Sequence, residues 1–423
     1  GKKGNFYVLT GDGELQEGAF WESLQPTANN KFSEITVIVD HNKIQSDAPI
    51  KEVSDLGLLE QKLGAFGWEV ARCDGHDIEA IKTVLDNFRK VVDRPKILIA
   101  DTVKGRGVSF MEKLSEDGYY KFHSGAPSFE NYNLAFKEIS DRINKKLAEL
   151  KLAALDFEAV ELAPKALPQS PHKLVTAYAD ELLKIAKERK GLVALDADLV
   201  LDTGLIPFKK ELPEQFVECG IAEQDMVSVA SGLALRGALP VVHSFACFLT
   251  TRPNEQIYNN ATERGKIIYV GSLAGLLPAL PGHSHQSVRD ISAIGGIPGL
   301  ILIQPATEGE ARLAIRWAVY ENNESAYIRL VSIPVEIPFK LPDDYRLKLG
   351  RGVYIKEGTD ILLIAYGPVM LSQAYNAALK LKEAGIDAAV MNLPWLNHID
   401  GGWLAEEVGK YKKIFTIDDH YVK

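Results

Sequence analysis

Runs of apolar and β-branched residues alternate along the chain with stretches in which apolar positions recur at helical spacing. Residues 5–10, 35–39 and 96–100 are such apolar runs and predict buried strands. Helical patterns separate them, one ending near residue 29 and another at residues 78–91. Strands that alternate with helices are typical of a parallel sheet, which binds ligands at the carboxyl ends of its strands. We therefore expect the first part of the chain to be an α/β domain.

Two further series repeat this alternation. Residues 128–156 predict a charged helix, and residues 163–171 hold three prolines, which are typical of a stiff connector. The second series has helices at 174–189 and 222–236 and strands at 192–195, 240–243, 267–271 and 300–304. The third has strands at 360–365, 387–392 and 413–417 and a helix at 371–384. The predicted fold class is thus α/β with successive parallel-sheet domains, at 1–156, 172–338 and 339–423, and with 157–171 as a linker.

The composition of the chain excludes several functional classes of protein. The chain has 423 residues, of which 46% are hydrophobic and 25% charged, as expected of a globular protein with real cores. Its net charge of -9 and its lack of a basic block argue against nucleic-acid binding. No apolar run approaches the roughly 20 residues of a membrane helix, and we expect neither a membrane partner nor a signal peptide. The three scattered cysteines, Cys73, Cys219 and Cys247, fit neither a disulfide framework nor a metal cluster and indicate a reducing cytoplasm.

The first chemical motif is Gly11-Asp12-Gly13 at the end of a predicted strand, with Asn42 at the end of the next. Glycines allow close approach of the backbone to a ligand. A carboxylate, an amide oxygen and a main-chain carbonyl near Ile44 could share one hard cation, and Mg²⁺ prefers such oxygens completed by ligand phosphates. The alternative is that the triplet is only a turn and that Asn42 caps a loop.

The second motif is Glu218-Cys-Gly-Ile-Ala-Glu-Gln-Asp225, which leads into the helix predicted from residue 222. An acidic residue at a helix start is often a simple cap. A buried Glu223 could instead hydrogen-bond a ring nitrogen of a cofactor, and burial would raise its pKa and let it exchange a proton.

Together these motifs resemble the thiamine-diphosphate signature of transketolases. The resemblance runs from residues 11–18 and 39–45 through 102–112 and 122–127 to Gly220-Ile-Ala-Glu223, in the order of that family. It implies three domains: a diphosphate-binding domain at 1–156, a pyrimidine-binding domain at 172–338 and a C-terminal domain at 339–423. Family members carry a segment before the Gly-Asp-Gly strand, so we expect the first domain to be incomplete, and the last to be short.

The resemblance also implies roles for individual residues. It implies that Asp12, Asn42 and the Ile44 carbonyl bind Mg²⁺, or Ca²⁺ or Mn²⁺ in its place. It places the cofactor against these residues and against Gly11, Gly13, Glu17, Asp198, Glu223, Phe245 and Phe248, with Glu223 on the aminopyrimidine and the two phenylalanines around that ring. Catalytic roles fall to Glu223, His123 and His285, and Glu17 and Glu22 match carboxylates near a dimer interface. Read alone, the aromatic residues are core, the histidines satisfied polar groups, Asp198 a turn residue and the glutamates exposed helix charges.

The implied function is transfer of a two-carbon ketol unit between sugar phosphates, by a homodimer with active sites at its interface and with thiamine diphosphate and magnesium as cofactors. Arg252 and Arg329 are candidate contacts for substrate phosphates on charge alone. Residues 280–286 lack the aspartate-glycine that the family has ahead of its histidine, and Asp74-Gly-His-Asp77 resembles deoxyxylulose-phosphate synthases. Two alternatives are therefore a decarboxylating carboligase of that kind and a catalytically silent fragment or subunit.

Overall fold

The computed structural model describes residues 4–124, 126–156 and 170–421. The chain divides into two compact units, Gly1–Lys165 with Gly220–Ala222, and Ala166–Cys219 with Glu223–Lys423. Most of the predicted linker, residues 157–169, lies outside the described residues. In the described residues no helix is long and apolar enough to cross a membrane.

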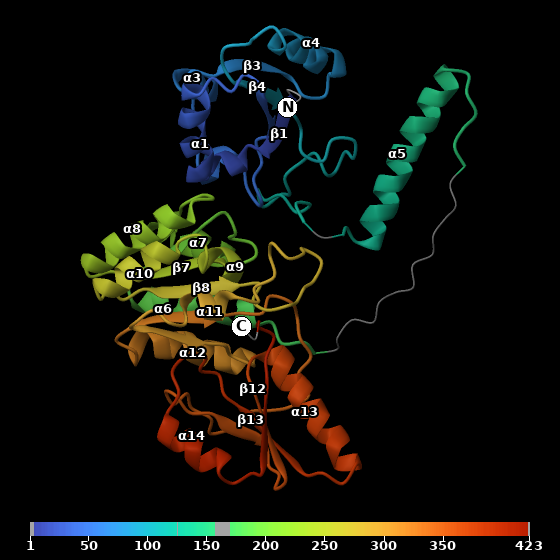
Figure 1. The fold of residues 1–423 in the computed structure, drawn as a ribbon. Helices are drawn as coiled ribbons and strands as arrows, with labels where there is room; N and C mark the ends of the chain where they lie inside the picture. Colours follow the sequence, from blue (N-terminus) through green and yellow to red (C-terminus); the bar gives the residue numbers. More distant parts are fainter. Residues whose placement is uncertain (1–3, 125, 157–169, 422–423) are drawn as a thin grey trace. The chain divides into compact units, whose positions relative to one another are not determined.

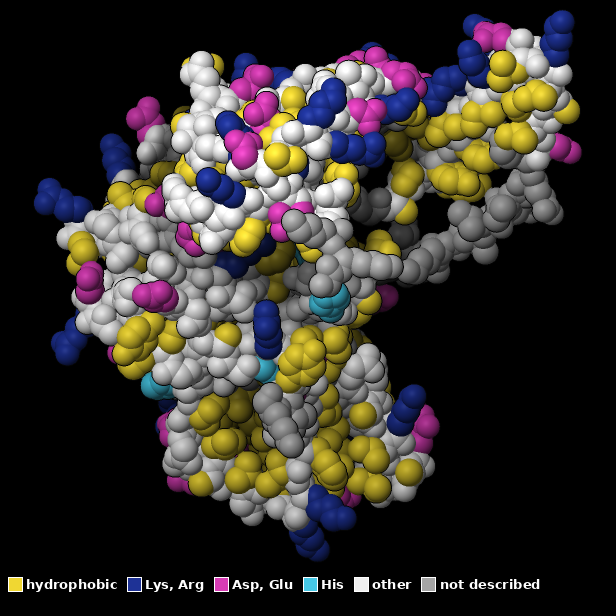
Figure 2. All heavy atoms as spheres, turned by 45° about the horizontal axis from the view of Figure 1, so that its top comes forward, with side chains coloured by type: hydrophobic (Ala, Val, Ile, Leu, Met, Phe, Trp, Pro, Cys, Tyr) yellow, Lys and Arg dark blue, Asp and Glu magenta, His cyan; other side chains and the backbone are white. Residues whose placement is uncertain are grey.

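The first unit is built on a parallel four-stranded sheet in the order β1-β2-β4-β3. Its strands are β1 (Phe6–Gly11), β2 (Ile35–His41), β3 (Glu69–Asp74) and β4 (Lys96–Asp101). Its helices are η1 (Gly13–Gln16), α1 (Gly18–Asn29), α2 (Ile50–Val53), α3 (Leu59–Ala65), α4 (Ile78–Phe88) and α5 (Phe129–Glu149). Residues of α1 and α3 bury one face of the sheet and residues of α4 bury part of the other, as both faces of a parallel sheet require. The predicted charged helix is α5, whose exposed apolar side chains gather at the upper right of Figure 2.

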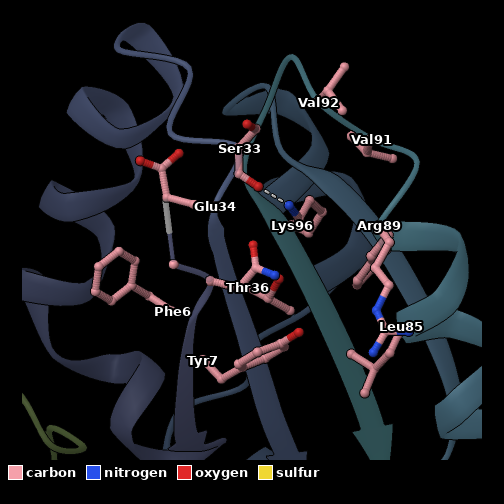
Figure 3. Close-up of a pocket in the computed structure, with 13 residues that line it drawn as sticks. Phe6, Tyr7, Ser33, Glu34, Thr36, Leu85, Arg89, Val91, Val92 and Lys96 are labelled. Atoms are coloured by element: carbon pink, nitrogen blue, oxygen red, sulfur yellow. Dashed lines mark hydrogen bonds between the residues drawn. The ribbon is translucent and has the colours of Figure 1, made fainter. Parts of the chain in front are cut away.

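Strand β1 is an edge strand whose side chains are poorly covered. Phe6 is 61% exposed and Leu9 is 74% exposed, and Tyr7 and Val8 between them are about half exposed. Beside this strand a pocket of about 620 Å³ opens at the amino ends of β1, β2 and β4 (Figure 3). Its lining includes Tyr7, Thr36, Leu85, Arg89 and Lys96, and Lys96 donates a hydrogen bond to the Ser33 carbonyl there. The pocket lies at the opposite end of the strands from Asp12 and Asn42, so it is not the predicted site.

The second unit contains a parallel six-stranded sheet in the order β6-β5-β7-β8-β10-β9. Its strands are β5 (Leu192–Asp196), β6 (Phe216–Glu218), β7 (Leu239–Phe245), β8 (Ile268–Ser272), β9 (Leu300–Ile303) and β10 (Ser325–Arg329). Its helices are α6 (Leu174–Glu188), α7 (Ile206–Glu211), η2 (Pro213–Gln215), α8 (Glu223–Leu235), α9 (Ala246–Leu249), α10 (Asn254–Thr262), α11 (Asp290–Ile294) and α12 (Glu308–Tyr320). Helices α8 and α10 cover one face, and α6 and α12 pack together on the other (Figure 1).

The same unit continues into a smaller sheet of order β11-β13-β12-β14. Its elements are β11 (Val353–Lys356), β12 (Ile361–Ala365), α13 (Pro368–Glu383), β13 (Ala388–Asn392), α14 (Gly401–Val408) and β14 (Lys413–Ile417). Strand β11 pairs antiparallel with β13, whereas the other pairs are parallel. The α/β fold class expected from the sequence is confirmed, and the antiparallel edge strand was not predicted.

A buried ion network joins the two sheets of the second unit. Arg329 ends β10 with no exposed surface, and its Nε donates to Asp290 Oδ2 at 2.8 Å. Its Nη1 lies 3.1 Å from Asp419 Oδ1, beyond the end of β14, and also donates to Gln304 Oε1. Its Nη2 donates to the Ser287 carbonyl at 2.7 Å. These donors are used inside the protein, which makes Arg329 part of the fold's interior; that it contacts a substrate phosphate stays a prediction.

We expect Arg329→Met to lower the free energy of unfolding by about 3–5 kcal/mol, because the change leaves buried carboxylates without their cation. Chemical denaturation followed by fluorescence measures this loss. Asp290→Asn in the same chain should recover part of it, since one uncompensated charge is then removed. Exposed Arg236→Gln is the matched control, and a loss below about 1 kcal/mol for Arg329→Met would contradict the network's role.

Candidate active site

The predicted metal residues lie together at the carboxyl ends of β1 and β2. Asp12 follows β1, is 2% exposed, and caps η1 by accepting a hydrogen bond from Gly13 N at 2.8 Å. Its other oxygen accepts from Lys43 N at 2.6 Å. Asn42 Oδ1 accepts from Ile44 N at 3.1 Å, so the turn after β2 is held against Asp12.

The chemistry of this oxygen set fits a hard cation that a ligand completes. Burial raises the pKa of Asp12, although hydrogen bonds from the backbone of Lys43 and Gly13 oppose the rise. A buried carboxylate of this kind is stabilised by a nearby positive charge. The described residues contain no group of three or more His, Cys, Asp or Glu that could hold a metal by itself. A cation here would therefore need the amide and carbonyl oxygens and further oxygens from a phosphate.

The glycines of the motif differ in what surrounds them. A Cβ atom added to Gly13 would lie 3.4 Å from the Gln45 side chain, so the backbone at Gly13 packs closely against Gln45. A Cβ atom added to Gly11 would have no other atom within 4 Å. Glu17 caps α1 without a side-chain bond to the helix and is half-buried, and Glu22 is exposed on the same helix.

Lys104 is a residue of this region that sequence reasoning missed. Its Nζ donates to the Ile44 carbonyl at 3.1 Å and to the Gln45 carbonyl, and it lies 3.0 Å from His123 Nδ1. Lys104 lies within residues 102–112, and its contacts could not be predicted because its partners are about 20 and 60 residues away in the sequence. The structure thus brings His123 and the predicted metal-ligand carbonyl of Ile44 to one ammonium group.

In the second unit the predicted ring-binding residues also come together. Glu223 is the first residue of α8 and is 1% exposed. Phe245 ends β7, Phe248 lies in α9, and their ring centroids are 5.7 Å apart. The His285 ring lies 5.1 Å from Phe248 and 5.9 Å from Phe245, edge-on to both. Phe245, Phe248 and His285 therefore form one cluster of two aromatic rings and an imidazole.

Arg252 joins this cluster in a way the sequence did not predict. Its Nη1 lies 2.6 Å from Glu223 Oε1, and its guanidinium carbon stands 4.0 Å from the centroid of the Phe248 ring. The predicted contact of Arg252 was a substrate phosphate; its contacts in this structure are with the carboxylate and the ring.

Asp198 lies at the carboxyl end of β5, which pairs with β7. It is buried with φ at +60°, and its N–H donates to Glu218 Oε1 at 3.0 Å. Neighbouring Asp196 accepts from Leu199 N and from the Thr203 hydroxyl, and burial, then the charge of Glu218, raises its pKa well above the ordinary value. The strained backbone at Asp198 is fixed by this carboxylate-rich turn.

Three segments of the chain match family models of known proteins. Residues 3–125 match the family "Transketolase, thiamine diphosphate binding domain", 171–332 match "Transketolase, pyrimidine binding domain", and 350–423 match "Transketolase, C-terminal domain". The chain belongs to the transketolase family, within the α/β proteins whose ligands bind at strand ends.

Individual relatives are distant. "Transketolase-like protein 2" of Mus musculus is 29% identical over 98% of this chain and 66% of its own length. "1-Deoxy-D-xylulose-5-phosphate synthase" of Treponema pallidum is 30% identical over 84% of this chain and 50% of its own length. A solved "Split gene transketolase, inactive beta4 tetramer" has 31% identity and a TM-score of 0.53, and covers 59% of this chain and 81% of that one. The chain thus spans about two thirds of the length of its full-length transketolase relatives.

Burial, and then the positive charge of Arg252, lowers the pKa of His285. We expect NMR titration to give His285 a pKa below the ordinary value of about 6.5, and Arg252→Gln to raise it. The unfolded chain binds a proton at His285 more readily than the folded chain does. Protonation of His285 should therefore lower the free energy of unfolding as the pH falls below about 6.5. Arg236→Gln should leave the titration unchanged; a His285 pKa that Arg252→Gln does not move would contradict the cluster.

Proposed function

We propose that this chain is a thiamine-diphosphate- and magnesium-dependent transketolase that moves a two-carbon ketol unit between sugar phosphates. The observation that carries the proposal is the buried Glu223 at the start of α8, which Arg252 links to Phe248 in the cluster with Phe245 and His285. A carboxylate beside an aromatic pocket suits a flat, nitrogen-bearing ring, and the match to the diphosphate-binding and pyrimidine-binding domains indicates which ring.

Asp12, Asn42 and the Ile44 carbonyl are the proposed ligands of the metal that accompanies the cofactor diphosphate. The backbone at Gly11 and Gly13 would lie along the diphosphate, because no side chain intervenes there. Magnesium is the proposed ion, since a single carboxylate with neutral oxygens and ligand phosphates is its usual setting.

The bound cofactor would supply the carbon chemistry that breaks and makes a bond beside a carbonyl. The chain's own residues would do the rest. Glu223 would hold a proton at the ring nitrogen, Phe245 and Phe248 would fix the plane of the ring, and Asp198 would lie near its reactive end. A carboxylate in this place acts by general acid–base catalysis.

The two histidines have different proposed roles in proton transfer. His285, with its lowered pKa, is neutral near pH 7 and so can accept a proton from a sugar hydroxyl. His123, beside the Lys104 ammonium, would donate to a developing alkoxide. Arg252 remains the candidate cation for a substrate phosphate.

We further propose a cytoplasmic homodimer with active sites at the subunit interface, to which Glu17 and Glu22 would contribute. We also propose the domain limits 1–156, 172–338 and 339–423, because the diphosphate and the ring of the cofactor would each need one of the first two domains.

A second candidate is a decarboxylating carboligase of the deoxyxylulose-phosphate-synthase kind. The 30% identity to the Treponema pallidum synthase over 84% of this chain favours it specifically. A third candidate is a catalytically silent subunit, and the observation that favours it is the 31% identity to the split-gene transketolase whose beta4 tetramer is inactive.

Product analysis separates these functions. The purified chain with thiamine diphosphate and Mg²⁺ is given a ketose phosphate labelled with ¹³C at its first two carbons and an unlabelled aldose phosphate. We expect both labelled carbons to appear together in the ketose phosphate that forms from the aldose phosphate. This transfer should stop when EDTA is added and resume when Mg²⁺ is restored. Labelled pyruvate with an aldehyde phosphate is the second arm. Carbon dioxide release there, without transfer from the ketose, would replace the proposal by the carboligase, and cofactor binding without either product would indicate the silent subunit.

We expect Glu223→Gln to slow hydrogen–deuterium exchange at C2 of the bound cofactor by about 10²–10⁴-fold, the usual contribution of an acid–base group. Glutamine keeps the shape and a hydrogen bond but cannot exchange the proton. NMR of quenched samples measures the rate, and exposed Glu255→Gln is the matched control. If Glu223 is only a helix cap, the exchange rate will be unchanged and the variant will lose at most about 2 kcal/mol of stability.

A further inference from the structure

Arg252 takes two of the contacts that the proposed ring site offers. One is the carboxylate of Glu223, 2.6 Å from Arg252 Nη1, and the other is the face of Phe248, 4.0 Å from the guanidinium carbon. The three residues come from the start of α8, from α9 and from the turn after α9. A flat ring that hydrogen-bonds Glu223 and stacks on Phe248 would need the same space.

The pairing has a plain physical cause. A carboxylate that is 1% exposed must be neutralised or hydrogen-bonded inside the protein, and Arg252 supplies a charge-assisted bond. The guanidinium is planar, delocalised and rich in N–H donors, and it stacks well on aromatic faces. Those are also the properties by which an aminopyrimidine would be recognised at this place.

We infer that Arg252 is an internal competitor of the aminopyrimidine ring: it contacts the same carboxylate and the same ring face, and it must leave Glu223 and Phe248 when the ring binds. The inference rests on the proposed function and adds to it a competitor built into the site. It makes cofactor binding an exchange of one planar donor for another, and the displaced guanidinium becomes available to an anionic substrate.

The local structure permits this exchange without moving the fold. Arg252 N donates to the Phe248 carbonyl at 3.0 Å, and the Thr251 hydroxyl donates to the Cys247 carbonyl at 2.6 Å, so the backbone of the turn is fixed. The Arg252 side chain is 32% exposed, whereas that of Glu223 is 1% exposed. The arginine therefore has a path to solvent and the carboxylate has none, so the arginine is the partner that moves.

A competitor inside the site lowers the apparent affinity for the ligand by the fraction of molecules whose site is open. Removing the competitor should then tighten binding while it destabilises the cofactor-free protein. A residue that merely supported the pocket would do the opposite to binding, since its loss would weaken it. The sign of the change in affinity therefore decides between the two roles.

The test is calorimetric titration of thiamine diphosphate with Mg²⁺ into the wild type, Arg252→Gln, Arg252→Lys and the control Arg236→Gln, whose site directly follows the last residue of α8. We expect Arg252→Gln to bind about 10-fold more tightly or better. Arg252→Lys should fall between it and the wild type, because lysine keeps the charge but not the planar stack. The control should match the wild type.

Thermal unfolding without cofactor gives an independent readout. Arg252→Gln should lower Tm, and in the double variant with Glu223→Gln the two losses should not add, since each removes the same pair. Equal or weaker binding by Arg252→Gln, with the wild type binding normally, overturns the inference alone. A wild type that binds no thiamine diphosphate overturns the proposed function as well. If Arg252→Gln does not fold, the affinity of Arg252→Lys decides, and an affinity no tighter than the wild type's overturns the inference.

Discussion

A guanidinium with no contact with water requires counter-charges inside the protein, and this requirement fixes how several segments of the second unit are positioned. Arg329 meets it with Asp290 at the start of α11 and Asp419 after β14, and it donates further hydrogen bonds to the Gln304 side chain and the Ser287 carbonyl. Segments from both sheets thus converge on one side chain. Asp290 and Asp419 would lose their buried counter-charge without it, so the placement of Arg329 constrains both segments.

The same network bears on the cluster around Glu223. Ser287 forms bridges with Ala274 and Gly275, so the loop that carries His285 is closed at both ends next to Arg329. A Cβ on Gly275 would lie 2.1 Å from Asp419 Oδ2, and only glycine lets the loop come this close to the C-terminal segment. His285 is thereby held against Phe245 and Phe248 by contacts made outside the site, a common way to position a side chain on a loop.

The sequence predicted the elements whose signals are local. β2 and β4 are continuous apolar runs, and Asp12 follows a strand in a glycine-flanked turn, so their place at the sheet edge followed from strand periodicity. The short strands β6 and β11 carry too few residues for a period to appear. Contacts between residues that are distant in the sequence could not be predicted for another reason. Nothing near Arg252 or Lys104 in the sequence distinguishes them from surface cations, and their partners are set only when distant strand ends meet.

The edge strand β1 has a consequence for the behaviour of the protein in solution. Its sequence, Phe-Tyr-Val-Leu-Thr-Gly, has no charge, no proline and no bulge, and its first four side chains are exposed to solvent. Natural sheets usually protect such an edge with lysine, with proline or with a covering element, because unpaired main-chain groups recruit strands from other molecules. A six-residue segment of this composition also has the character of those that stack into fibrils. Where β1 is left uncovered, a high protein concentration and long storage therefore favour aggregation through pairing of this edge strand between molecules.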